Sequence, residues 1–228
     1  VFRKYHKDII MKVRIFNLKV LAVMSVIILL ATESCKKDQE EIRDGDGNVY
    51  TTVTIGTQVW LKENLRTTRY NDGTSIPNVT GDAWEPLLTP AYCWFGDLEA
   101  NAGIYGGLYN FFAVKSGKLC PTGFHVPSRG EVLILTDFLG ADAGGQMKSM
   151  TLWNVPNDGA NNSSSFTALP GGMRISSFIH NGMFGYYWTS TLFNTNSGYY
   201  FILSYDNALV EEDNRWGSSG LSVRCIKD

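Results

Sequence analysis

The sequence predicts an α+β domain that is rich in β-structure, with long loops and one main amphipathic helix. Its composition indicates this class, because 23 glycines and 13% aromatic residues accompany only 18% charged residues, below the usual quarter. Short apolar–polar alternations separated by turn-forming residues indicate many short strands. One stretch, residues 128–140, carries signals for both ends of a helix. Without an N-terminal leader, the remaining length is that of one domain with its own core.

The predicted helix begins and ends at recognisable residues. Ser128 precedes Glu131 by three positions, the spacing of a capping box in which each side chain hydrogen-bonds the other residue's backbone N–H. Gly140 stands where a helix commonly ends in a left-handed residue. The expected apolar face consists of Val132, Leu135, Phe138 and Leu139, with Leu133 and Ile134 beside it. We expect the sheet to pack on this helix.

The N-terminal segment, residues 1–34, is predicted to be a signal peptide region. Met11 is a better start than the residues before it, and three positive charges and an apolar run over 20–31 follow it. This run is shorter than the about 20 residues of a spanning helix and has the length of a signal-peptide core.

Cys35 follows this run after a few small residues. The arrangement resembles the lipobox of bacterial lipoproteins, in which the cysteine thiol is alkylated with diacylglycerol. The resemblance implies a lipid anchor at Cys35 and a place in the cell envelope, at the outer membrane. Acidic residues after Cys35 resemble a surface-export signal. Residues 35–45 then form the lipidated cysteine and a flexible tether, and 46–228 form the domain. The alternative is an ordinary secreted signal peptide with a chance cysteine.

Several further segments are expected to form strands. Alternation over 49–55, a turn at 56–57 and a return over 58–62 are typical of a hairpin. Segment 108–114 fits a strand or a short helix equally well, and 143–150 fits one helical turn. The other expected strands are 91–95, 186–191, 198–205 and 221–227. The main expected loops are 66–90, 154–165 and 206–218.

Asp44, Asp46 and Asn48 alternate in a glycine-rich stretch that could suggest a calcium loop. Such a loop needs about six to eight oxygen ligands, including a bidentate glutamate at its last position. This chain has Ile55 there. A turn that leads into the first strand is the favoured interpretation.

The charge and the titratable residues exclude several functions. The net charge of −2, without a basic cluster, gives no electrostatic argument for nucleic acid. His125 is expected to make a structural hydrogen bond, and no histidine has a metal-ligand neighbour at the usual spacing. No nucleophile motif appears. Asp97, Glu99 and the acidic run 211–213 could pair for glycoside hydrolysis, but solvated carboxylates are the simpler interpretation. We therefore expect neither enzyme activity nor a metal site.

Ordered sequence blocks carry a resemblance to one family, the Fibrobacter succinogenes major paralogous domain. The resemblance covers roughly residues 46–228 and implies a secreted or lipid-anchored protein of the kind found in Bacteroidota, in agreement with Cys35. It implies no particular activity. The blocks are DGNVY, IGTQVWLKENL, YNDGTSIP, AYCWF, GGLYNFFAV, LCPTGFHVPS, WNVPNDGANNSSSFTALPGG, YYWTST and SVRCIKD.

The arrangement is also similar to C-type-lectin-like domains, in which a cysteine-bearing strand precedes the first helix and a late cysteine-bearing strand lies near it. The similarity implies a disulfide between Cys120 and Cys225, which would leave Cys93 as a buried free thiol. The alternative pair is Cys93 with Cys120. In an oxidising envelope such a bridge contributes roughly 2–5 kcal/mol.

In sugar-binding members of that class, calcium is held by a Glu-Pro-Asn-type loop and a Trp-Asn-Asp strand. Here 155–158 is Val-Pro-Asn-Asp and 205–207 is Tyr-Asp-Asn, so the calcium-dependent interpretation is weakened. We expect no cofactor, with calcium as the alternative. A calcium-independent binding face is expected on the loops 154–165 and 206–218. Its candidate residues are Asn157, Asp158, Asn161, Asp206, Asn207 and Trp216.

The favoured function is a lipid-anchored binding or adhesion module of the cell envelope, with a glycan or an envelope protein as partner. The alternatives are an envelope enzyme acting on polysaccharide and a structural subunit of a surface assembly.

Overall fold

The computed structural model describes residues 41–85 and 87–228. The predicted signal peptide and the predicted lipidation site at Cys35 lie outside the described residues. Glu41–Asp228 forms one compact unit. Its first strand, β1 (Ile42–Arg43), pairs with β2 (Val49–Tyr50). Folded structure therefore begins within the segment that the sequence suggests is a tether.

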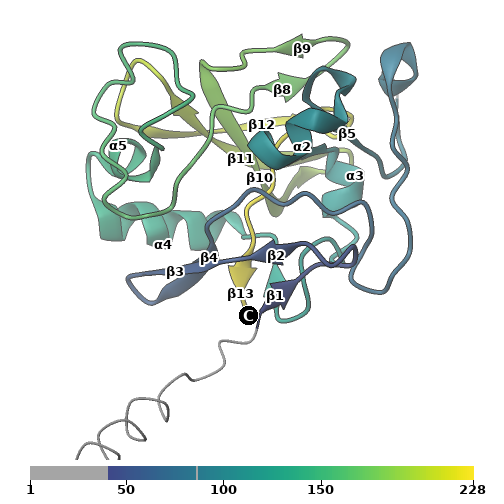
Figure 1. The fold of residues 1–228 in the computed structure, drawn as a ribbon, viewed down its shortest axis with the longest axis horizontal. Coiled ribbons are helices and arrows are strands. Elements are labelled where there is room, and N and C mark those ends of the chain that lie inside the picture. The colour runs from purple at the N-terminus through teal and green to yellow at the C-terminus, as the bar shows by residue number, and fades with distance from the viewer. Residues whose placement is uncertain (1–40, 86) are drawn as a thin grey trace, which may run out of the picture. The chain divides into compact units, whose positions relative to one another are not determined.

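The unit is built from small antiparallel sheets and short helices, so the predicted β-rich α+β class is confirmed (Figure 1). A four-stranded sheet has the order β3 (Thr52–Ile55), β4 (Gln58–Leu61), β13 (Ile226–Lys227) and β7 (Phe124–His125). A three-stranded sheet has the order β10 (Phe184–Asn194), β11 (Ser197–Ser204) and β12 (Val210–Trp216). Further pairs are β1–β2, β5 (Tyr92–Trp94) with β6 (Gly107–Tyr109), and β8 (Met173–Arg174) with β9 (Phe178–Ile179).

The helices are short except for one. They are η1 (Gly81–Trp84), η2 (Phe95–Asp97), η3 (Glu99–Asn101), α2 (Ala102–Tyr105), α3 (Phe111–Val114), α4 (Arg129–Leu139) and α5 (Ala143–Met147). Helices α4 and α5 lie on one side of the unit, and α2 and α3 lie on the other (Figure 1). Within the described ranges, no helix has the length and apolar character needed to cross a membrane.

Helix α4 has the predicted ends. The Ser128 hydroxyl accepts a hydrogen bond from the Glu131 N–H at 3.2 Å, and the Glu131 carboxylate accepts one from the Ser128 N–H at 2.7 Å. This reciprocal pair confirms the capping box. Gly140 follows the helix with a φ of 81°, a conformation that favours glycine.

The buried face of α4 is narrower than the sequence suggests. Val132 and Leu135 are fully buried, and Leu139 is half-buried. Phe138 was expected on the same face, but it is 64% exposed and packs at the edge of the unit against the turn at Gly56. A Cβ atom at Gly56 would lie 3.0 Å from the Phe138 ring, so this contact favours glycine in the turn.

Residues 210–216 form strand β12 where a loop was expected. The segment VEEDNRW has charged residues at most positions and no apolar alternation, so the sequence carries no strand signal. The strand forms because it pairs along β11, from Val210 opposite Leu203 to Trp216 opposite Ser197. It is also tied to α4, because Glu212 forms an ion pair of 2.8 Å with Arg129.

Two other segments differ from the expected elements. Segment 108–114 contains both a strand and a helix, because Asn110 ends the first and caps the second by accepting a hydrogen bond from Ala113 N at 3.0 Å. The expected strand 49–55 is interrupted at Thr51, whose N–H donates to the Glu63 carboxylate at 2.9 Å. Side-chain acceptors thus divide segments that the pattern presents as continuous.

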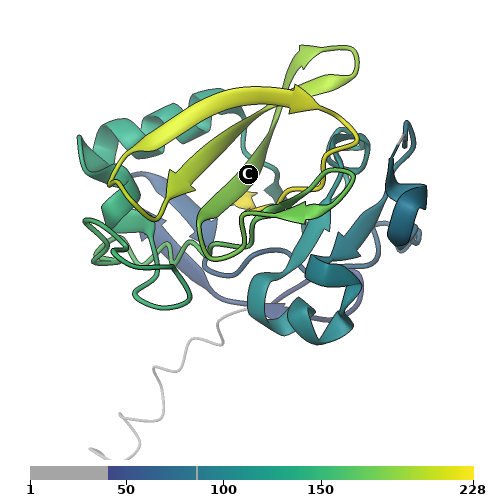
Figure 2. The same ribbon diagram turned by 90° about the horizontal axis from the view of Figure 1, so that it is seen from above.

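The β10–β11 hairpin separates two hydrophobic clusters. Trp188 and Phe111 lie in one of them, with ring centroids 5.1 Å apart. Tyr187, the next residue along β10, points to the other cluster and stacks on Phe201 at 4.9 Å, on the side of Leu135. Figure 2 shows this twisted sheet crossing the unit, with β12 along its edge. Alternation along β10 therefore serves both cores.

The disulfide joins Cys120 and Cys225, as the resemblance implied, with Cα atoms 6.0 Å apart. It links the segment before β7 to the start of β13. Cys93 is buried and free, and burial raises the pKa of its thiol to about 12. The alternative pair, Cys93 with Cys120, does not form.

Candidate binding site

Five of the six predicted binding residues lie on two loops that meet at Lys148. The Lys148 side chain is fully buried, and its ammonium donates to the carbonyl oxygens of Asp158, Ser204 and Asn207, each at 2.8 Å. Asp158 N also donates to Tyr205 O at 2.8 Å. The loop over 154–165 and the turn after β11 therefore contact one another, as expected.

The Lys148 ammonium occupies the point where these carbonyl dipoles converge. Burial lowers its pKa, while the nearby carboxylates of Asp158 and Asp206 act in the opposite direction. Its nitrogen also lies 5.4 Å from the centre of the Trp153 ring, within cation–π range. The chain thus supplies its own cation between the two loops. The described part of the chain contains no group of three or more His, Cys, Asp or Glu side chains placed to hold a metal ion.

The side chains of these predicted residues mostly stabilise their own loops. Asn157 donates to Ser149 O at 3.2 Å, Asn161 accepts from Ser163 N at 2.9 Å, and Asn207 accepts from Leu209 N at 2.9 Å. Asp206 accepts from the Ser204 hydroxyl. Asn157 Oδ1 is nevertheless buried without a hydrogen-bond partner, and Asp158 is exposed.

The alternating acidic residues near the N-terminus of the unit also stabilise local structure. Asp44 is buried and accepts hydrogen bonds from Asp46 N, from Asn48 N at 3.0 Å and from the Tyr50 hydroxyl at 2.6 Å. Asp46 accepts from the Thr68 hydroxyl at 3.0 Å. These contacts hold residues 44–48 in the turn between β1 and β2.

His125 lies between two carboxylates. Its Nδ1 is 2.7 Å from Asp228 Oδ1, and its Nε2 is 2.9 Å from Glu131 Oε1. Burial lowers the pKa of His125, but the hydrogen bonds to Asp228 and Glu131 outweigh burial and leave it raised. Ser128 donates to the same Glu131 carboxylate rather than to the histidine. The arrangement links β7, β13 and the start of α4, which is a structural role.

Two of the carboxylates considered for catalysis are engaged in ion pairs. Asp97 pairs with the buried guanidinium of Arg174, and Glu212 pairs with Arg129. Glu211 points to the other face of β12 from Glu212, because successive strand residues alternate. Asp213 lies two positions from Glu211 and therefore shares its face of the strand, so these two carboxylates are neighbours on β12.

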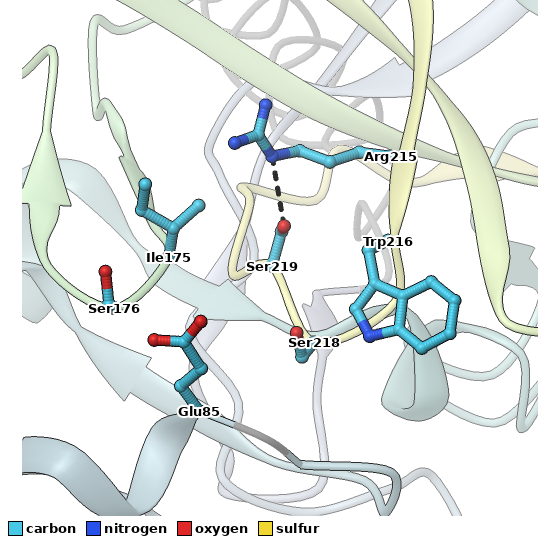
Figure 3. A pocket seen from close by; sticks show the side chains of 7 residues that line it. All are labelled: Glu85, Ile175, Ser176, Arg215, Trp216, Ser218 and Ser219. Atoms are coloured by element: carbon cyan, nitrogen blue, oxygen red, sulfur yellow. Dashed lines mark hydrogen bonds between the residues drawn. The ribbon is translucent and has the colours of Figure 1, made fainter.

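Trp216 lies apart from the other predicted residues, because β12 spans about 20 Å between them. It lines a pocket of ≈ 280 Å³, which we call the Trp216 pocket (Figure 3). One wall comes from the residue after η1, a second from the turn between β8 and β9, and the third from the end of β12 and the turn that follows. The lining residues are Glu85, Ile175, Ser176, Arg215, Trp216, Ser218 and Ser219.

Arg174 joins the three walls of the Trp216 pocket. Its guanidinium donates to Gly81 O at 2.6 Å and lies between the rings of Trp84, at 4.9 Å, and Phe178, at 4.5 Å. Its backbone pairs with Gly220 through hydrogen bonds of 2.9 and 2.8 Å. The Arg174 side chain therefore holds the segment before Glu85 against the β8–β9 hairpin, and its backbone holds the turn after β12.

The turn after β12 positions the remaining wall. Gly217 N donates to Asn196 O at 2.7 Å, and a Cβ atom at Gly217 would lie 2.7 Å from that oxygen, so the close approach requires glycine. Arg215 Nε donates to the Ser219 hydroxyl at 3.0 Å (Figure 3). Trp216 is 50% exposed at the rim.

The Trp216 pocket combines one carboxylate, one guanidinium, three hydroxyls and an exposed indole. It can form charged hydrogen bonds and stack on a ring, but none of its lining residues is a histidine or a cysteine. Sequence reasoning found Trp216 alone. The other lining residues come from three distant segments of ordinary polar composition, and no local pattern in the sequence distinguishes them.

The fold and this pocket define a β-rich α+β domain with a small polar pocket. The chain belongs to the Fibrobacter succinogenes major domain family, whose sequence model matches residues 53–227. The family resemblance of the sequence blocks is thereby confirmed. No match was found among curated proteins, and none among solved structures.

Proposed function

We propose that this protein is a lipid-anchored binding or adhesion module of the cell envelope, with a C-type-lectin-like domain that binds its partner at the Trp216 pocket. The leader pattern and Cys35 support the anchor at the outer membrane. The pairing of Cys120 with Cys225, beside the strand before α4 and the last strand, supports the lectin-like arrangement.

The single observation that carries the binding role is the exposure of Trp216. Tryptophan is largely buried on average, and an exposed indole beside arginine is typical of binding hot spots. Here half of the Trp216 surface is accessible next to the half-buried Arg215. This combination favours binding over catalysis.

Binding at this site does not require calcium in our proposal. From the sequence, calcium binding remained an alternative for the loops 154–165 and 206–218. In the structure, the Lys148 ammonium holds these two loops together. The Trp216 pocket contains one carboxylate, Glu85, which is too few for a calcium site with about six to eight oxygen ligands.

A second candidate function is a structural subunit of a surface assembly. The outer face of α4 supports it, because Leu133, Ile134 and Phe138 are all exposed on this helix. An exposed apolar patch is typical of protein contacts.

The test is binding of the soluble chain from Lys36 to Asp228, which contains the whole compact unit, to isolated envelope material and to a glycan array. Each assay is run with and without a calcium chelator. We expect selective binding that survives the chelator and falls at least tenfold in W216A. F193A is the matched control, because Phe193 is also 50% exposed but lies outside the pocket. Equal binding by wild type and W216A would refute the proposal.

A further inference from the structure

We propose that the Trp216 pocket recognises a single neutral sugar ring through adjacent hydroxyl groups. This inference rests on the proposed function and names the ligand class of the same site. It follows from the size of the pocket, its balance of charge and the chemistry of its rim.

The size of the pocket suits one ring. Pockets for drug-sized ligands have volumes of about 300–1,000 Å³, and this one, at ≈ 280 Å³, lies just below that range. A longer glycan would therefore place one terminal or branching residue in the pocket and extend over the surface beside it.

The charges in the pocket are opposite and equal in number. Glu85 and Arg215 both line it, and among the described ion pairs neither residue takes part. A phosphate or a uronate would be attracted by Arg215 but repelled by Glu85. A cation would be attracted by Glu85 but repelled by Arg215. A neutral ligand with both donors and acceptors avoids either penalty.

Adjacent hydroxyl groups match these two side chains. A carboxylate accepts two hydrogen bonds and a guanidinium donates several in a fixed plane, so each can engage neighbouring hydroxyls. Arg215 is held in place by its Nε bond to Ser219, at 3.0 Å. The hydroxyls of Ser176 and Ser218 add groups that both donate and accept.

The rim supplies the apolar part of the contact. One face of a pyranose carries C–H groups, and an exposed indole offers a flat apolar surface with a polar N–H at its edge. Trp216 lies at the rim beside Ser218 (Figure 3), and Ile175 lines the pocket with Ser176. The site thus pairs one apolar surface with a charged, hydrogen-bonding interior.

The experiment uses methyl glycosides of glucose, galactose and mannose as neutral probes, with methyl glucuronide and glucose 6-phosphate as charged comparators. Binding is read by saturation-transfer NMR and by competition with the envelope material. We expect at least one neutral glycoside to bind and to compete, and both charged probes to bind at least tenfold more weakly.

Variants separate a direct role from a structural one. W216A and E85A should each weaken binding of the neutral probe at least tenfold, whereas F193A should change it less than twofold. E85K should shift the preference toward the glucuronide, a change of selectivity that loss of folding would not produce. Failure of E85K to alter the ratio of neutral to charged binding would overturn the inference.

The outcomes distinguish this inference from the proposed function. If envelope binding requires Trp216 but resists every sugar and is abolished by protease treatment of the envelope, the partner is a protein and only the sugar inference fails. If envelope binding does not require Trp216, the proposed function fails as well.

Discussion

Lys148 Nζ donates a 2.8 Å hydrogen bond to the carbonyl oxygen of Asp158, across ten positions of the sequence. The same ammonium holds Ser204 O and Asn207 O, so one buried charge fastens the loop over 154–165 to the turn after β11. Irregular loops leave backbone carbonyls without a ladder partner, and buried carbonyls need donors. A lysine side chain supplies three of them.

We expect K148M to destabilise the protein by about 3 kcal/mol, because several buried carbonyl groups lose their donor at once. Urea unfolding would measure the change. K118M is the control: Lys118 is exposed and pairs with Asp72, and solvent-exposed pairs of this kind contribute little to stability. A K148M variant as stable as K118M would contradict the role assigned to Lys148.

We expect R174K to weaken envelope binding. The planar guanidinium of Arg174 packs against the rings of Trp84 and Phe178 and so holds the pocket walls together, and a lysine ammonium cannot replace it. Amide hydrogen exchange should become faster at Gly81, because its N–H donates to the Asp97 carboxylate that pairs with Arg174. The measurement combines exchange mapping with the binding assay.

The matched control for R174K is R224K. Arg224 is equally buried and donates to Leu61 O at 3.2 Å and Asn64 Oδ1 at 2.6 Å, away from the Trp216 pocket. Both variants should lose stability, but R224K should keep its binding. Equal loss of binding in both would show that Arg174 acts through general stability alone.

Removal of the disulfide should be costly. Cys120 and Cys225 are 105 positions apart. Closing a loop of that length lowers the conformational entropy of the unfolded chain, which stabilises the folded state by up to about 4.7 kcal/mol in the loop-entropy account. C120S/C225S should therefore lower the free energy of unfolding by roughly 2–5 kcal/mol. The comparison variant C93S alters a buried thiol that forms no bridge, and its cost should be smaller. A double variant no less stable than C93S would rule out this contribution.

The His125 contacts predict a pH-dependent stability. The folded state raises the pKa of His125 above the unfolded value of about 6.5. A raised pKa means that the contribution is fully present below about pH 6.5 and is lost as the pH rises through the higher folded pKa. Because the side chain is 37% exposed, solvent screening keeps the effect on the order of 1 kcal/mol or less.

Urea unfolding of wild type and H125Q between pH 5.5 and 8, roughly one to two units on either side of the free histidine pKa, tests this. The stability advantage of wild type should shrink as the pH rises. H180Q serves as the comparison, because His180 contacts the Tyr186 hydroxyl rather than a carboxylate. An advantage that grows with pH would have the wrong sign for the arrangement seen here.

The predictions that rest on a few neighbouring residues were correct. The Ser128–Glu131 capping box and the glycine after the helix depend on contacts three or four positions apart, so the chain specifies them locally. The hairpin of β3 and β4 was recognised for the same reason. The disulfide was implied by resemblance, since spacing alone left Cys93 as an alternative partner.

Features that depend on distant partners were decided by the tertiary structure. Strand β12 has no apolar pattern. It forms because its backbone pairs with β11 and because Glu212 forms an ion pair with Arg129. The outward position of Phe138 depends on where the turn at Gly56 lies. The predicted binding residues separated into a cluster at Lys148 and a pocket at Trp216 because a strand, rather than a loop, connects them.

By itself, the sequence determined the class of fold, the main helix with its caps and the family of this protein, since these rest on composition, local hydrogen bonding and ordered motifs. The tertiary structure alone decided which residues form a site. Glu85, Ser176 and Arg215 line one pocket only after Arg174 joins their segments. Such long-range contacts depend on packing and burial across the whole chain, so no local sequence pattern predicts them.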